Sequence, residues 1–272
     1  MSKVQDKFWM FGVRPHQDDV HLLRDKYWSE RCKSRITAAE GAYILNVQNM
    51  IMVTCEGEPA PFSSDAYGYA ESFCKMKQVV WSSAGAGAFR GGNEEAFICE
   101  LAEKYPNIVG TYLDDFSSAF PKSDPERAQK SVALLREIKS KLEGACRKMD
   151  IYVTWYWHEE PYEGMLDVVD GVVLWTWRST DIPKLKERFE AVEDKYKGKK
   201  IFLGIYMYDF VGRCSVPVDL MEYQCNYALE LLKQKRIEGL VFEANSVMGV
   251  GLESELWLRD WTDKVKDIEI ED

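Results

Sequence analysis

Two adjacent aspartates, Asp114 and Asp115, are the residues of this sequence best suited to acid–base chemistry. They close the apolar run Gly110-Thr-Tyr-Leu-Asp-Asp-Phe116. Side chains alternate between the two faces of a strand, so one of the two carboxylates must point towards the inner face. A carboxylate at the end of a buried strand is costly unless it is paired or used. The pair is therefore a candidate for general acid, general base or nucleophilic work.

A second acid, Glu243, stands in a similar place. It lies in the run Leu240-Val-Phe-Glu-Ala-Asn-Ser246, and it points inward together with Asn245 if Val241 does. Its structural alternative is an ion pair with Arg14 or Arg178.

Two more acids follow apolar, aromatic runs. Glu160 comes after the run that ends at His158, and Asp209 comes directly after Tyr208. Each has a structural alternative, because Asp209 could cap a turn and Glu160 could belong to a solvated acidic loop.

The elements that must position these acids alternate between short β-rich runs and longer amphipathic stretches. This alternation predicts βα units around a parallel sheet, and the length of 272 residues suits one barrel. We predict a single (β/α)8 (TIM) barrel domain over residues 1–272, an α/β fold. The predicted strands are Phe8–Arg14, Ala42–Gln48, Gln78–Ser83, Ile108–Asp114, Ile151–His158, Gly171–Arg178, Ile201–Asp209 and Leu240–Asn245.

Helix signals separate these strands. Asn93 precedes Glu94-Glu95, Pro125 opens a long helix, and a last helix is predicted over Glu253–Val265. The acidic tail Asp267–Asp272 is expected to fray.

In a barrel, the carboxyl ends of the strands converge on one mouth, where the active site lies. The predicted ends carry aromatic, amide and cationic side chains besides the acids. Flat aromatic faces suit sugar rings, while acids and amides bind the hydroxyls. The residues expected to bind substrate are Arg14, His16, Gln48, Trp81, Trp157, His158, Trp177, Arg178, Tyr208, Asp209 and Asn245.

With these residues in place, the whole chain resembles (β/α)8-barrel glycoside hydrolases of the broad type with an Asp-rich fourth strand end. The motif that matches is Tyr112-Leu-Asp-Asp-Phe116. The common Asn-Glu at strand four and Glu at strand seven are absent, and so is the chitinase-type D-x-x-D-x-D-x-E. The resemblance implies hydrolysis of a glycosidic bond by a pair of carboxylates.

Such hydrolysis needs one protonated acid and one ionised carboxylate on either side of the bond. We expect Asp115 or Asp114 to work with Glu243, with Glu160 as the spare candidate. The expected substrate is a small molecule or an oligosaccharide, and no cofactor or metal ion is expected.

Two other functions remain open. A metal-dependent sugar isomerase or lyase would gather oxygen and imidazole ligands, and Pro15-His-Gln-Asp-Asp-Val-His21 has His/Asp spacing that resembles the His-Pro-Asp-Asp motif of zinc deacetylases. An Asp-rich helix start explains the same residues. A non-catalytic sugar-binding barrel would use the same aromatic and acidic side chains.

A glycine-rich stretch, Ser82 to Gly92, follows one strand and precedes a helix. Arg90 stands where the third glycine of a dinucleotide fingerprint would fall, and no Gly-Lys-Ser/Thr is present. A lid-like loop or a tight turn is the better interpretation.

The bulk charge narrows the partners. The 45 acidic and 35 basic side chains give a net charge of −10, which disfavours nucleic acid and an anionic membrane surface, although local patches could override it. The longest apolar runs are too short to span a bilayer. Seven scattered cysteines form neither a disulfide framework nor a zinc signature. They indicate a reducing, cytoplasmic location, unless a signal peptide has been removed.

Overall fold

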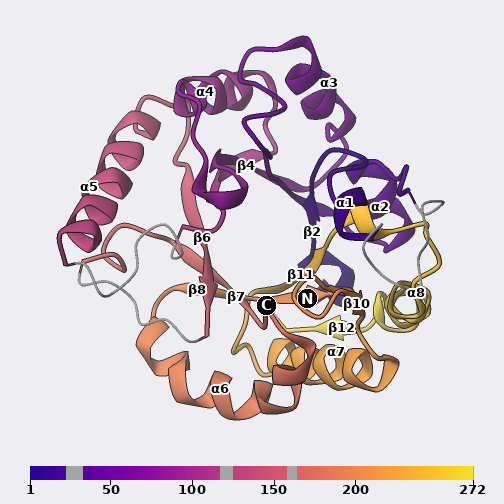
Figure 1. Ribbon diagram of the computed structural model, residues 1–272. Helices are drawn as coiled ribbons and strands as arrows, with labels where there is room; N and C mark the ends of the chain where they lie inside the picture. The colour runs from indigo at the N-terminus through magenta and orange to yellow at the C-terminus, as the bar shows by residue number, and fades with distance from the viewer. Residues whose placement is uncertain (23–32, 117–124, 158–163, 272) are drawn as a thin grey trace.

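The computed structural model describes residues 1–22, 33–116, 125–157 and 164–271. Within them, eight parallel strands close into a barrel in the order β11-β2-β3-β4-β5-β6-β7-β8, and helices surround it (Figure 1). The predicted (β/α)8 barrel is confirmed. Its strands are β2 (Phe8–Gly12), β3 (Asn49–Met52), β4 (Gln78–Ala84), β5 (Ile108–Leu113), β6 (Asp150–Tyr156), β7 (Gly171–Trp175), β8 (Lys200–Tyr206) and β11 (Gly239–Glu243).

The helices lie between successive strands and cover the barrel, except between β6 and β7, where the described residues contain no helix. They are α1 (Asp19–Leu22), α2 (Ala38–Ile44), α3 (Ser64–Ser72), α4 (Glu94–Lys104), α5 (Pro125–Leu142), α6 (Leu185–Val192), α7 (Val218–Lys233) and α8 (Glu253–Val265). Short 3₁₀ turns add η1 (Val4–Lys7), η2 (Ala86–Ala88), η3 (Ser179–Lys184), η4 (Glu193–Tyr196) and η5 (Asn245–Val247). The last helix has the predicted bounds. In the part of the chain that the structure describes, no helix has the length and apolar character needed to cross a membrane.

The prediction for the second strand is wrong. Residues 42–48 were expected to form it, but Ala38–Ile44 is helix α2 and the strand is Asn49–Met52. A capping box starts the helix: the Thr37 hydroxyl accepts from the Glu40 N–H at 3.2 Å, and the Glu40 carboxylate accepts from the Thr37 N–H at 2.8 Å. Gln48 therefore precedes β3 at the amino end of the barrel, away from the mouth.

The carboxyl-terminal tail is also ordered where fraying was predicted. Glu269–Ile270 forms β12, which pairs antiparallel with β1 (Ser2–Lys3). The Val4 N–H donates to the Ile268 carbonyl at 2.9 Å and continues the contact. Backbone pairing between the two ends of the chain holds the tail in place. The acidic composition of the tail does not predict this pairing.

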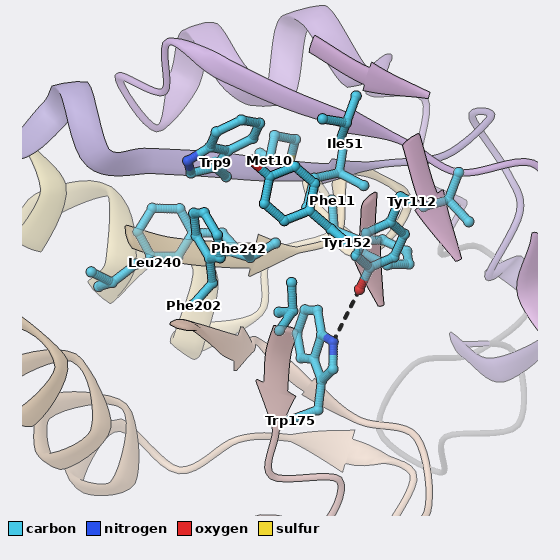
Figure 2. Packing of buried hydrophobic residues seen from close by; sticks show 14 of the residues in the cluster. Trp9, Met10, Phe11, Ile51, Tyr112, Tyr152, Trp175, Phe202, Leu240 and Phe242 are labelled. Carbon is cyan, nitrogen blue, oxygen red and sulfur yellow. Dashed lines mark hydrogen bonds between the residues drawn. The ribbon is translucent and has the colours of Figure 1, made fainter. Parts of the chain in front are cut away.

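Large side chains fill the barrel interior in layers and form a floor under the mouth. The lowest layer contains Trp9, Ile51, Val80, Tyr152, Val173 and Phe202. Above it, Trp175 lies across the barrel and donates to the Tyr112 hydroxyl (Figure 2). Gly204 makes room for this ring, since a Cβ there would lie 2.0 Å from Trp175 Cε3. The open space at the carboxyl end therefore begins above a packed floor.

Candidate active site

A cavity of about 310 Å³ opens at the carboxyl end of the barrel, and four carboxylates line it. Asp114 and Asp115 follow β5, Glu243 ends β11, and Asp18 comes from the loop after β2. In the described residues, none of the four forms an ion pair with lysine or arginine. The other lining residues are Phe11, Val13, Gln17, His21, Cys55, Ala86, Thr154, Tyr156, Trp175, Trp177, Tyr206, Phe210.

Strand alternation brings Asp114 into the cavity. Tyr112, two residues earlier, points inward and contacts Phe11 and Trp175. Thr154 Oγ1 donates to Asp114 Oδ1 at 2.7 Å, and the Tyr112 hydroxyl lies 2.6 Å from Thr154 Oγ1. Since the Thr154 proton is used by Asp114, the Tyr112 hydroxyl must donate to Thr154. A chain of hydrogen bonds from Trp175 Nε1 through Tyr112 and Thr154 therefore ends on this carboxyl.

The pKa of Asp114 is raised to about 8 by its burial and then by the charge of neighbouring Asp115, while the Thr154 hydrogen bond opposes the shift. Asp114 is only 7% exposed. This side chain therefore holds a proton more readily than an ordinary aspartate.

Asp115 is turned differently because its backbone is left-handed, with φ of 48°. Its two oxygens accept from two elements: Oδ1 from the Tyr156 hydroxyl at 2.6 Å, and Oδ2 from the Gly87 N–H at 2.9 Å. Gly87 lies in η2, within the glycine-rich stretch. Gly85 starts this turn, where a Cβ would lie 2.1 Å from the Thr54 carbonyl oxygen. The stretch is thus a tight turn that holds a carboxylate of the mouth cavity, and both oxygens of Asp115 accept a hydrogen bond.

Glu243 faces the aspartates from the opposite wall. In the barrel order, β11 and β5 are four strands apart, which is half the circumference. Burial raises the pKa of Glu243 well above its usual range, and the charges of Asp18, Asp114 and Asp115 add to the shift, while a hydrogen bond from Tyr206 opposes it. Neither Arg14 nor Arg178 pairs with it, so the ion-pair alternative is not what the structure shows.

Asp18 is the cavity carboxylate that sequence reasoning missed as a site residue. The Ser246 hydroxyl donates to its Oδ2, and burial raises its pKa, opposed by the Ser246 hydrogen bond and by nearby His21. His21 lines the same cavity and packs its ring 5.3 Å from Phe210. The doublet Asp18-Asp19 after the first strand was the available signal. Its interpretation as a helix start also holds: Asp19 begins α1, and the Asp18 carbonyl accepts from the Leu22 N–H at 3.2 Å, while the Asp18 side chain lines the cavity.

The aromatic residues divide as strand alternation requires. Trp175 and Tyr206 point inward, with ring centroids 4.8 Å apart. Trp177 stands at the rim, 48% exposed and 5.7 Å from the Tyr156 ring. By contrast, Trp157 packs outward on Phe189 and donates to the Thr176 hydroxyl at 2.9 Å.

Two predicted substrate-binding residues hold the backbone at the mouth. The Asn245 side chain accepts from the Val13 N–H at 2.8 Å and donates to the carbonyls of Val13 and Ile36. Asp209 accepts from the N–H groups of Ser179, Val211 and Gly212 and from the Ser179 hydroxyl, so it caps two turns. Both lie outside the cavity lining.

Four more predicted residues, Trp81, Tyr208, Arg14 and His16, also lie off the mouth cavity. Trp81 packs outward on Phe97 of α4, and the fully buried Tyr208 donates to the His21 carbonyl at 3.3 Å. Arg14 donates to Gln17 at 3.2 Å, and exposed His16 contacts Asp19 at 2.9 Å. His158 and Glu160 lie outside the described residues.

A second cavity of about 290 Å³ adjoins the first. Trp175 and Trp177 line both cavities, and Trp157, Arg178, Asp181 and Arg188 complete the second. Arg178 and Trp157, predicted to bind substrate, thus lie together here. Over the described ranges, no group of three or more His, Cys, Asp or Glu residues is arranged to hold a metal ion.

Comparison with known proteins gives structural matches only. A Bacteroides thetaiotaomicron protein assigned as an α-L-fucosidase matches with a TM-score of 0.58 and 12% identity, over 99% of this chain and 98% of that one. The GH99 endo-α-mannosidase from the same organism matches with a TM-score of 0.55 and 10% identity, over 96% and 97% of the two chains.

A third similar structure is a tryptophan synthase α-subunit from Pyrococcus furiosus, with a TM-score of 0.51 and 12% identity, over 98% of this chain and 100% of that one. No protein-family model and no curated protein matches the sequence. At these identities the matches establish the barrel fold, which this chain has in common with glycoside hydrolases and with at least one unrelated enzyme.

Proposed function

We propose that this barrel hydrolyses a glycosidic bond in the mouth cavity. Glu243 is the general acid that protonates the leaving oxygen, and Asp115 is the ionised carboxylate on the other side of the sugar. Asp114 positions Asp115 by accepting from its backbone N–H at 2.9 Å. The inward aromatic rings stack on the sugar, and the acids bind its hydroxyls.

One observation carries the proposal: half-buried carboxylates with opposed environments face each other across one cavity. Burial and then the like charges around Glu243 raise its pKa, which favours the protonated form. Asp115 instead accepts two hydrogen bonds, from Tyr156 and Gly87. Carboxylates with different surroundings in one site are what acid and base roles require.

The positions also favour one stereochemical course. Inverting glycosidases separate their carboxyl groups by about 6.5–9.5 Å, which leaves room for a water molecule. Glu243 and Asp115 follow strands on opposite walls of the barrel, an arrangement that suits a wide pair. We therefore expect inversion, and proton NMR of the first product formed would identify its anomer.

The test of Glu243 uses its Gln variant with two kinds of aryl glycoside, chosen from a panel of sugars. With 4-methoxyphenyl glycosides, Glu243→Gln should lower kcat/KM by about 10²–10⁴-fold, the usual contribution of general acid catalysis. With 2,4-dinitrophenyl glycosides the loss should be much smaller, because this leaving group departs without a proton. Activity towards the first substrates should also fall on the alkaline side, as Glu243 loses its proton.

The matched control is Glu238→Gln, just before the same strand, where the carboxylate pairs with Lys7 at 3.0 Å on the opposite end of the barrel. It should leave kcat/KM unchanged. Equal losses on both substrates for Glu243→Gln would remove Glu243 as the acid. If the wild-type protein binds sugars of the panel but hydrolyses none, it is a non-catalytic sugar-binding barrel and the proposal fails.

A further inference from the structure

The second cavity differs from the first in charge, although the two share a wall. Four carboxylates line the mouth cavity, whereas the second holds the guanidinium groups of Arg178 and Arg188 and one carboxylate, Asp181. The described side chains of this cavity thus sum to one positive charge, in a protein of net charge −10. A cationic cavity attracts anions even when the protein as a whole is acidic, so its charge suits an anionic ligand.

Both arginines of the second cavity have N–H groups that form no ion pair with a described carboxylate. Arg188 Nη2 contacts Asp181 Oδ1 at 2.9 Å, with both side chains 31% exposed, and its other N–H groups are not used in that contact. Arg178 is exposed, and its guanidinium has no carboxylate partner among the described residues. Guanidinium groups bind carboxylates and sulfates through paired N–H donors, which a lysine ammonium cannot reproduce.

The shared wall connects this cavity to the proposed chemistry. Trp175 and Trp177 line both cavities, and Trp177 is half exposed at the rim. Trp157 closes the second cavity from the side of β6 and is held by its hydrogen bond to Thr176. Indole faces next to polar groups suit a sugar ring, so a chain of two sugars can extend from one cavity to the other across Trp177.

We propose that the second cavity is a subsite for an anionic sugar residue, bearing a carboxylate or a sulfate ester, next to the sugar held in the mouth. Arg178 and Arg188 bind the anionic group and Trp177 supports the ring. The inference deepens the proposed function and rests on it for the position of the scissile bond. Recognition of the anionic sugar itself is a property of the second cavity alone.

The test is therefore a binding measurement without hydrolysis. Glucose, glucuronate and glucose 6-sulfate are titrated into the wild-type protein, and binding is followed by tryptophan fluorescence and calorimetry. At least one anionic sugar should bind about 10-fold or more tightly than glucose, equivalent to about 1.4 kcal/mol. The stronger of the two anions identifies carboxylate or sulfate, and the preference should weaken as salt is added.

Three variants separate charge from shape. Arg178→Gln and Arg188→Gln should each lower the anion preference severalfold, whereas Arg178→Lys should lower it less, because the charge remains and the paired donors are lost. Arg35→Gln is the control: it removes one exposed positive charge outside the lining of either cavity. Trp177→Ala should weaken all three sugars.

Equal binding of the three sugars, no binding of any, or a preference that survives both arginine-to-glutamine changes would each overturn the subsite. Because no bond is broken in these titrations, the result does not depend on whether Glu243 acts as an acid. A protein that shows the anion preference without hydrolysis would keep the subsite and lose the proposed function.

Discussion

The two ends of the barrel use the same acidic residue types in opposite ways. At the amino end, a cavity of about 190 Å³ is lined by Asp6, Glu238 and several lysines. Lys77 pairs with Asp6 at 2.7 Å, Lys7 with Glu238 at 3.0 Å, and nearby Asp150 with Lys200 at 2.7 Å. At the carboxyl end, Asp18, Asp114, Asp115 and Glu243 have no such partner among the described residues.

The difference shows in proton affinity. At the amino end, burial alone would raise the pKa of Asp6 and Asp150, but hydrogen bonds from lysines outweigh it and lower both pKa values. Burial and like charges instead raise the pKa of Asp114 and Glu243. An acid with cationic neighbours stabilises the fold. A buried acid without them destabilises the fold, but it holds a proton that it can exchange near neutral pH. Perturbed groups of the second kind are typical of functional sites.

The sharpest way to test this comparison is to neutralise one aspartate at each end. Asp115→Asn should lower kcat/KM by about 10²–10⁴-fold, since the anionic carboxylate is lost while asparagine tolerates the left-handed backbone. Asp150→Asn should leave kcat/KM unchanged. Steady-state kinetics on one glycoside compares them, and a similar loss in both variants would mean that the mouth has no special role.

The pH dependence of stability should differ at the mouth. The pKa of Asp114 is higher in the folded protein than in the unfolded chain, so the folded state binds more protons between the two values. Its contribution to stability is present below pH 4 and is lost as the pH rises through about 8. The unfolding free energy of Asp114→Asn minus that of wild type should therefore rise by at least about 1 kcal/mol as the pH goes from 5 to 9.

Urea denaturation at a series of pH values measures this difference. The gain should be absent in Asp150→Asn, whose aspartate has a lowered pKa. A flat difference between Asp114→Asn and wild type over that range would contradict the raised proton affinity.

The smallest effect is expected at the amino end. Asp6→Asn removes a partly exposed ion pair with Lys77, which should cost at most about 1 kcal/mol of unfolding free energy at neutral pH. Because the pKa of Asp6 is lowered on folding, this contribution is present above the unfolded pKa and disappears as the pH falls through the folded pKa. The same urea series shows it, and a loss that grew towards acid would have the wrong sign.

Sequence reasoning recovered most of the barrel because its strands are β-rich runs bounded by clear helix signals. It failed where a run was short and fitted both periodicities. Residues 42–48 are apolar enough for a strand, and only the capping box of Thr37 and Glu40 distinguishes the helix that is present. The resulting error displaced Gln48 to the wrong end of the barrel.

The candidate site was predictable where alternation alone determines direction. Asp114 and Glu243 follow inward-pointing residues, and both line the cavity. Asp18 lies in a loop, where no periodicity predicts the direction of a side chain. The direction of Asp115 depends on a left-handed backbone, which the sequence pattern does not predict. Asn245 was predicted to face a ligand, but its side-chain amide forms hydrogen bonds with three backbone groups that are distant in sequence.

The pairing of β1 with β12 has a practical consequence for attaching the protein to a surface or to another polypeptide. Ser2 lies opposite Ile270 in this small ribbon, and Ser2 also lines the amino-end cavity. A tag or tether added at either side of the ribbon would leave from the face opposite the mouth. Immobilised in this way, the protein would present both cavities to a ligand in solution.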